Sequence, residues 1–136
     1  MTAKEYLRQY EYAVKRIKRI EEEYKQEQLL IDAIRSTSDN DGMPHGTNIS
    51  RPTEDKAIRL ADKALRLSEA RLEAISIRQE IFDLVDSVDG IEGEVLHERY
   101  INLHKWEEVC VIVNYSWQGV HLVHKRALAI IENRLK

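Results

Sequence analysis

The chain has 136 residues, of which 43% are hydrophobic and 33% are charged, a composition that predicts a folded protein and excludes one disordered throughout. Its single cysteine excludes an internal disulfide, and its net charge of -3 excludes a strongly basic coat for nucleic acid. The longest apolar runs, such as residues 109–113, are too short to span a bilayer, and the charged N-terminal residues contain no apolar signal segment. We therefore expect a cytoplasmic protein without membrane contact.

Residues 3–35 are predicted to form one long amphipathic helix. Apolar side chains recur along it every seven residues on two lines, which is typical of a coiled coil. The two lines consist of Ala3, Tyr10, Ile17, Tyr24 and Ile31, and of Tyr6, Ala13, Ile20 and Ile34. Glu27 is the one polar interruption of the second line.

Residues 36–52 are predicted to form a loop because Gly, Pro, Ser, Asn and Asp cluster there. Thr53 follows as the expected N-cap of a second long helix over residues 54–88. The apolar stripe expected to face the core of that helix consists of Ile58, Ala61, Leu65, Leu72, Ile75 and Phe82.

Two helices of similar length joined by a loop predict an antiparallel helical hairpin, assigned to a domain of residues 1–90. A single pair of helices buries its apolar surface incompletely, so a second copy or the C-terminal unit is expected to cover the rest. The residues expected to support such homo-oligomerisation are Tyr6, Tyr10, Ile17, Tyr24, Leu65 and Leu72.

A break at residues 89–93 opens the second domain, residues 91–136. Three shorter helices are expected there, at about 92–101, 105–113 and 116–135. The second is expected to turn Trp106, Val109, Cys110, Ile112 and Val113 inward, and the third Val120, Val123, Ala127, Ile130 and Ile131. The whole chain is thus predicted to be all-α, a long antiparallel hairpin followed by a three-helix helix-turn-helix domain.

The short link between the last two helices carries the functional prediction. Asn114 tolerates the left-handed backbone that a sharp turn needs, and Ser116 is a good N-cap. Charge also changes here: residues 91–115 hold two basic and five acidic side chains, and residues 116–136 hold four basic and one acidic. A local basic face is what phosphate contact requires.

The outer N-terminal part of the last helix is the part that a helix-turn-helix presents to the major groove. The predicted DNA-binding residues are Ser116, Trp117, Gln118, His121, His124, Lys125 and Arg126. Gln118 suits adenine, and Lys125 and Arg126 suit phosphate or guanine. An alternative for Arg126 is to brace the core against Glu98 or Glu108. A three-helix bundle that never touches DNA is the competing structural interpretation.

Catalytic and metal sites are not predicted. His121 and His124 are spaced for one helix face, but no second cysteine or nearby carboxylate completes a zinc set. Asp83, Asp86 and Asp89 lack a base, a nucleophile or a phosphate-binding loop beside them, and Cys110 is expected to be a structural thiol. We therefore expect no enzyme activity and no cofactor.

The segment VLHERYINLHKWEEVCVIVNYSWQGVHLVHKRAL, residues 95–128, resembles region four of bacterial sigma factors, which reads the promoter −35 element. The matching positions are Val95, Leu96, Arg99, Tyr100, Trp106, Glu108, Val109, Ser116, Val120, Arg126, Ala127 and Leu128. Cys110 departs from the usual alanine. Residues 117–119 depart from the usual small or basic residues, so the family's base preference does not carry over.

The DGMPHG run of residues 41–46 is followed by a long charged helix and then by the C-terminal unit. In this order of features, nearly the whole chain resembles a second family. These are small phage proteins related to the autolysin-regulatory-protein-like (ArpU-like) and RinA-like regulators of phage late genes. The resemblance implies a transcription regulator from a phage or prophage of a Gram-positive bacterium, one that binds double-stranded DNA in the cytoplasm of the bacterial host cell. The alternative is a coiled-coil adaptor or scaffold that binds host RNA polymerase or another phage protein without reading DNA.

Overall fold

A computed structural model describes the backbone of residues 1–39 and 51–136 and the side chains of residues 1–35 and 54–136. Every regular element within those ranges is a helix, which confirms the all-α class. The DGMPHG run lies outside the described residues. Across the described part of the chain, no helix has the length and apolar character needed to cross a bilayer.

The predicted first helix is interrupted near its start. Helix α1 spans Ala3–Leu7 and α2 spans Gln9–Asp39, with Arg8 between them. A capping box at Thr2 and Glu5 fixes the beginning of α1: the Thr2 hydroxyl accepts from the Glu5 amide at 3.2 Å, and the Glu5 carboxylate accepts from the Thr2 amide at 3.0 Å. The heptad pattern runs through the interruption because the backbone of Arg8 stays in the right-handed region.

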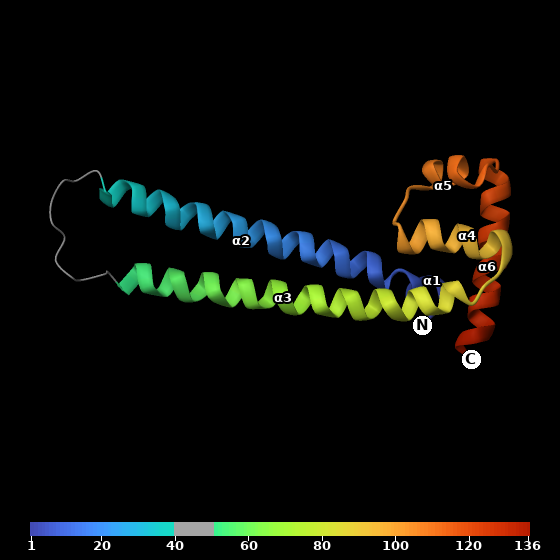
Figure 1. Ribbon diagram of the computed structural model, residues 1–136, viewed down its shortest axis with the longest axis horizontal. Helices are drawn as coiled ribbons and strands as arrows, with labels where there is room; N and C mark the ends of the chain where they lie inside the picture. The colour runs from blue at the N-terminus through green and yellow to red at the C-terminus, as the bar shows by residue number, and fades with distance from the viewer. Residues whose placement is uncertain (40–50) are drawn as a thin grey trace. The chain divides into compact units, whose positions relative to one another are not determined.

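Both long helices extend into the region predicted as a loop. Helix α2 continues to Asp39, and α3 spans Arg51–Asp86 (Figure 1). The prediction of a loop over 36–52 was therefore too long at each end, and Thr53 lies inside α3 instead of capping it. Helix propagation explains this, since each added residue of moderate propensity gains a hydrogen bond without a new nucleation cost.

The chain divides into two compact units, and the second of them, residues 15–72, contains most of both long helices. Two ion pairs fix their antiparallel register: Glu21 with Arg71 at 3.0 Å and Glu27 with Lys63 at 3.4 Å. Glu27, which breaks the predicted apolar line, thus has its charge matched by the facing helix. Ile31 of α2 is buried in this unit.

The apolar stripe predicted for α3 is not the one that faces the interior. Leu67 and Ala70 are buried, whereas Ile58, Leu65 and Leu72 are exposed at 60%, 59% and 66%. Helix α3 carries two apolar stripes with seven-residue spacing, and periodicity cannot tell which one meets α2. The prediction chose the outer stripe, except at its last member, Phe82, which is half-buried and packs against a buried cluster that includes Ile81 and Val85.

The residues predicted to support oligomerisation separate into three groups. Leu65 and Leu72 are exposed, and Ile17 and Tyr24 are half-buried. Tyr6 and Tyr10 instead pack against the core of the first unit. Burial, followed by the charge of Glu80, raises the pKa of Tyr6. These two tyrosines therefore pack partly against this chain's own core, and because neither is fully buried their assignment to an interface stays a prediction.

The first compact unit consists of residues 1–14 and 73–136. It holds α1, α4 (Gly90–Leu96), the π-helical η1 (His97–Ile101), α5 (Trp106–Val113) and α6 (Trp117–Leu135). Its larger core consists of Ala3, Leu7, Ile81, Val85, Val88, Leu96, Tyr100, Ile101, Ala127 and Ile131. The chain's beginning and the end of α3 therefore pack with the C-terminal helices, so the compact units are not divided at residue 90 as the predicted domains are.

A tight connection joins α3 to α4. Gly90 has a φ of +79°, which favours glycine. Gly93 is buried, and a β-carbon built on it would lie 2.0 Å from the carbonyl oxygen of Val88. Close packing of α4 against the preceding backbone thus requires glycine at position 93.

Candidate nucleic-acid interface

The turn between α5 and α6 has the geometry that its residues predict. Asn114 adopts the left-handed conformation, with φ 59° and ψ 46°. The Ser116 hydroxyl accepts a hydrogen bond from the Gly119 amide at 3.0 Å, which caps α6. Gly119 leaves room for this cap, because a β-carbon there would lie 3.1 Å from the Ser116 oxygen. The turn at Asn114 and the cap at Ser116 are both confirmed.

Helix α6 buries one face against its neighbours and leaves the opposite face open. Val120 and Val123 are fully buried and form a small core with Val95 and Val109, around which α4, α5 and α6 gather (Figure 1). Because Val120 and Val123 lie on the covered side, residues about half a turn away around the helix axis are turned outward.

The open face of α6 carries Gln118, Leu122 and Lys125, all exposed. They follow one another at spacings of four and three residues, so they lie in a row along one side of the helix. Gln118 and Lys125 are thus accessible for contact, as the predicted role in DNA binding requires. Leu122, 63% exposed, was not included among the predicted contacts, although the same spacing could have identified it.

His121 and Trp117 belong to an aromatic cluster. The His121 ring lies between Trp106 and Trp117, with ring centroids 4.8 Å and 4.5 Å away. Its Nε2 atom is buried and has no hydrogen-bond partner within the described residues. Trp117 is 51% exposed. Of this pair, Trp117 is the side chain that a ligand of α6 would meet first.

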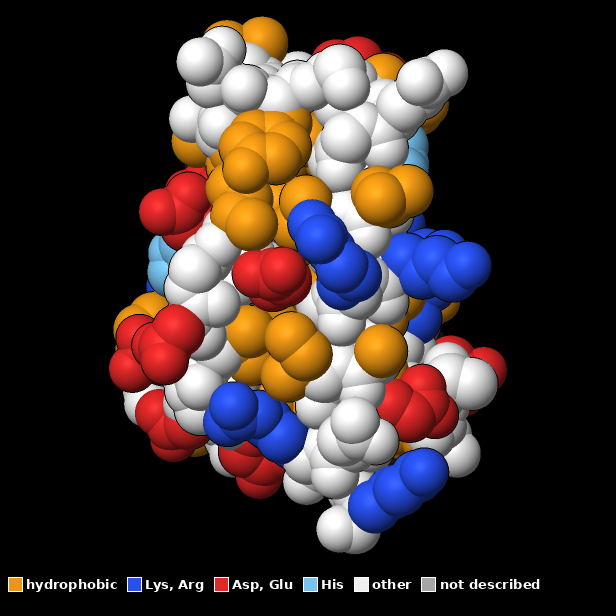
Figure 2. Space-filling view, turned by 90° about the vertical axis from the view of Figure 1, so that its right-hand side faces the viewer, with side chains coloured by type: hydrophobic (Ala, Val, Ile, Leu, Met, Phe, Trp, Pro, Cys, Tyr) orange, Lys and Arg blue, Asp and Glu red, His pale blue; other side chains and the backbone are white. Residues whose placement is uncertain are grey.

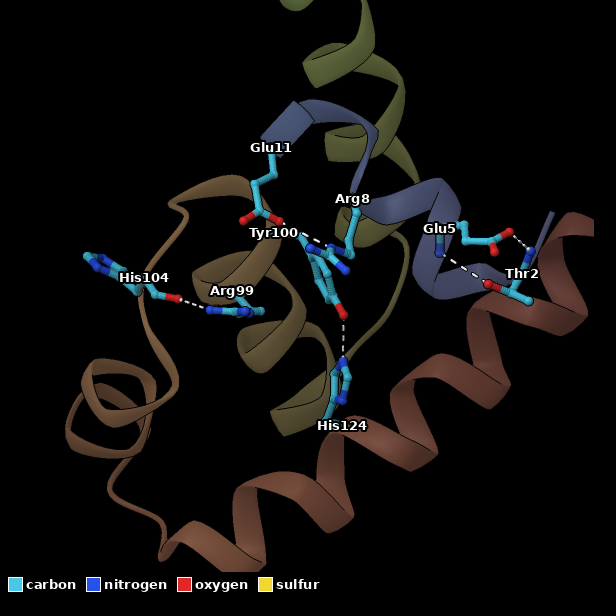
Figure 3. A network of polar contacts seen from close by, with 8 residues as sticks. All are labelled: Thr2, Glu5, Arg8, Glu11, Arg99, Tyr100, His104 and His124. Carbon is cyan, nitrogen blue, oxygen red and sulfur yellow. Dashed lines mark hydrogen bonds and ion pairs between the residues drawn. The ribbon is translucent and has the colours of Figure 1, made fainter. Parts of the chain in front are cut away.

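His124 does not face a groove, which corrects its predicted role. It is 8% exposed, and its Nε2 lies 2.6 Å from the Tyr100 hydroxyl (Figure 3). Burial, followed by the charges of Lys4, His121 and Arg99, lowers the pKa of His124 to about 4. The ring is therefore neutral at physiological pH. The 3.6-residue periodicity places position 124 at the border between the two faces, and Tyr100 and Trp106 cover it.

Tyr100 completes this buried pair. Burial raises its pKa to about 12, so the hydroxyl keeps its proton. The hydroxyl and the neutral His124 ring share one hydrogen bond, whose direction is set by which ring nitrogen carries the proton. Sequence reasoning placed Tyr100 only within the sigma-like motif. A histidine and a tyrosine 24 residues apart give no local signal that they will bond.

Arg126 is accessible but has a partner in the chain. Its Nε lies 3.8 Å from a carboxylate oxygen of Glu92, and its side chain is 58% exposed. The predicted braces, Glu98 and Glu108, instead pair with His104 at 3.4 Å and 2.7 Å. The ion pair between Arg126 and Glu92 is long and exposed, so it contributes little to stability. The Arg126 guanidinium can therefore turn to another acceptor.

Exposed apolar side chains occur on α5, in the turn after it and on α6. Val111, Ile112, Tyr115, Trp117 and Leu122 are exposed at 80%, 50%, 43%, 51% and 63%. Ile112 was predicted to face inward, but position 112 is half exposed because Val109 and Val113 occupy the side of α5 that meets the core. Figure 2 shows hydrophobic patches interspersed with basic and acidic side chains on the side of the molecule to which α6 contributes.

Comparisons with family models, with curated proteins and with solved structures each found no match to this chain. No group of three His, Cys, Asp or Glu side chains among the described residues could hold a metal ion.

Proposed function

We propose that the protein binds duplex DNA sequence-specifically and regulates the transcription of phage or prophage late genes. The main support for the proposal is the geometry of the turn between α5 and α6, residues 114–116. A left-handed Asn114 and a capping Ser116 hold α6 so that Gln118, Leu122 and Lys125 project from its N-terminal half. A helix-turn-helix inserts this part of its second helix into the major groove. The sigma-like motif over residues 95–128 supports the same function.

The expected contacts follow from side-chain chemistry. Gln118 can make paired hydrogen bonds to adenine, and Leu122 can pack against the methyl group of thymine. Lys125 and Arg126 can reach phosphates, and the amide groups exposed at the start of α6 favour another. His124 is left out of this set because it is buried against Tyr100.

Charge reversal on the open face tests the proposal. We expect Gln118→Glu with Lys125→Glu to weaken binding to the best fragment at least about tenfold, because two outward groups would then repel phosphates and base edges. The measurement is fluorescence anisotropy at two salt concentrations, against duplexes from the phage late-promoter region. Wild-type binding should fall steeply as salt rises.

The matched control is Lys18→Glu with Gln28→Glu, the same charge change at exposed positions of α2. An equal loss of affinity in both variants would show general electrostatic attraction and contradict the assigned face. If folded wild-type protein binds no duplex at low salt, DNA recognition is rejected.

An adaptor is the second candidate function, and the exposed apolar side chains of α5 and α6 favour it. Contiguous apolar surface often marks a protein interface, and Val111 and Leu122 are largely exposed. In this alternative the same joint docks RNA polymerase or another phage protein. A pull-down on purified polymerase tests it: binding should survive the charge reversal and be lost with Val111→Asp and Leu122→Asp.

We propose further that the hairpin associates with a second copy through Ile58, Leu65 and Leu72, which repeat every seven residues on α3 and are exposed. Leu65→Gln with Leu72→Gln is expected to convert a dimer to a monomer in sedimentation equilibrium at micromolar concentration. Val111→Gln, which removes an exposed aliphatic side chain from another helix, should leave the mass unchanged. A wild-type protein that is already monomeric would refute the association.

A further inference from the structure

A small cavity lies beside the buried Tyr100–His124 pair. Its volume is about 110 Å³, and it is lined by Lys4, Arg8, Glu11, Arg99, Tyr100 and Trp106. All of these residues belong to the first compact unit. Three cationic side chains and one carboxylate thus surround a space that would hold a few water molecules, each of which occupies about 30 Å³ in the liquid.

Two irregularities of the backbone bring these side chains together. The interruption at Arg8 separates α1 from α2, and the Arg8 amide donates to the Lys4 carbonyl at 3.0 Å. On the other side, Arg99 and Tyr100 lie in the π-helical η1. Such π-helical segments are rare and frequently occur at functional sites.

Arg99 is held in a fixed orientation at the cavity. One guanidinium nitrogen donates to the His104 carbonyl at 2.9 Å (Figure 3). The central carbon of the guanidinium lies 4.8 Å from the centroid of the Trp106 ring. A guanidinium that stacks on an aromatic face and binds a carbonyl keeps further donors for another acceptor, because it has five N–H groups.

The charges around the cavity are not balanced. Arg8 pairs with Glu11 at 3.3 Å. Among the described residues, no carboxylate forms an ion pair with Lys4 or Arg99. Lys4 and Arg99 also contribute to lowering the pKa of His124, so their positive potential extends into this part of the protein.

We propose that this cavity binds a phosphate group through Lys4, Arg8 and Arg99, with Trp106 as one wall. Arginine presents paired donors that match phosphate oxygens, and Lys4 supplies an adjustable point charge. The phosphate can belong to a small anion or to a nucleic-acid backbone, since the recognising chemistry is the same. This site is separate from the open face of α6 and does not depend on DNA recognition there.

Trp106 makes the proposal measurable. In a Trp117→Phe background, we expect sodium phosphate, titrated at ionic strength held constant with sodium chloride, to change tryptophan fluorescence saturably. Lys4→Gln should weaken the apparent affinity a few-fold because Lys4 is exposed. Arg99→Gln should weaken it about tenfold because charge-assisted hydrogen bonds are lost. Lys18→Gln, the same loss of charge on α2, should change nothing.

Circular dichroism establishes whether each variant is folded. If Arg99→Gln does not fold, Lys4→Gln by itself still tests the proposal. A fluorescence change that never saturates, or one that is the same in wild type and Lys4→Gln, overturns the proposal.

Measuring duplex binding of the same variants by fluorescence anisotropy identifies the source of the phosphate. If Lys4→Gln weakens binding to all duplexes equally and free phosphate competes with them, the site takes a backbone phosphate. If phosphate binds saturably but duplex affinity is unchanged, or duplexes do not bind at all, the site takes a small phosphorylated ligand. Both outcomes require the saturable phosphate binding of the first arm.

Discussion

Replacing Gly93 with alanine is expected to lower the free energy of unfolding by about 3 kcal/mol, the upper range for inserting a methyl group into packed structure. The new β-carbon would lie 2.0 Å from the Val88 carbonyl oxygen and 3.1 Å from its carbonyl carbon. These are backbone atoms at the end of a connection that also contains Gly90, so they cannot rotate away as a side chain would. Helix α4 would have to move off the core that contains Val85 and Val88.

Urea unfolding followed by circular dichroism measures this effect. The matched control is Gly119→Ala, also a helical glycine, whose β-carbon would meet the Ser116 side-chain oxygen at 3.1 Å. There the gain in helix propensity of about 1 kcal/mol offsets a disturbed cap, so we expect a change within about 1 kcal/mol. Equal stability of Gly93→Ala and wild type would contradict the close approach of α4 to Val88.

Acidification is expected to destabilise the protein through His124. The pKa of this histidine is lowered from 6.5 to about 4 in the folded chain, so between these values the unfolded chain binds the extra proton and the folded chain does not. Stability contributed by neutral His124 is complete above pH 6.5 and is lost progressively as pH falls towards 4. A difference of this size corresponds to about 3 kcal/mol.

The variant His124→Gln isolates that contribution, since glutamine can still accept a hydrogen bond from Tyr100 but does not titrate. Its urea-unfolding free energy should fall less between pH 7 and pH 4.5 than that of the wild type, whatever its stability at pH 7. The charged or titratable groups that act on His124, namely Lys4, Arg99 and His121, are present in both proteins. Parallel pH profiles would show that His124 is not held neutral by burial.

The substitutions at Gly93 and His124 change residues that hold α6 in position. They do not change the side chains of α6 that are expected to contact DNA. Gly93 sets how closely α4 approaches the end of α3, and the Tyr100–His124 bond fixes one side of α6 against η1. If α6 reads DNA, loss of either support should reduce affinity without altering the side chains that meet the bases.

Local features of the sequence determined the helical elements and the joint between the last two. Asn114 and Ser116 specify their conformations through their own backbone and side-chain chemistry, so the turn and the cap could be predicted without any tertiary contact. The seven-residue repeat of α2 likewise identified Ile31, which is buried, although Ile34 on the second predicted line is exposed.

Only the tertiary structure decided which of two possible faces is covered. Helix α3 has apolar stripes at Leu67 and at Leu65, and only the folded chain shows that the stripe at Leu67 is the buried one. Position 124 lies at the edge of the core stripe of α6, and the hydroxyl of Tyr100, from a different helix, makes it a buried neutral histidine. The cationic cavity arises in the same way, since Lys4 and Arg99 are 95 residues apart and meet only because α1 folds back onto the C-terminal helices.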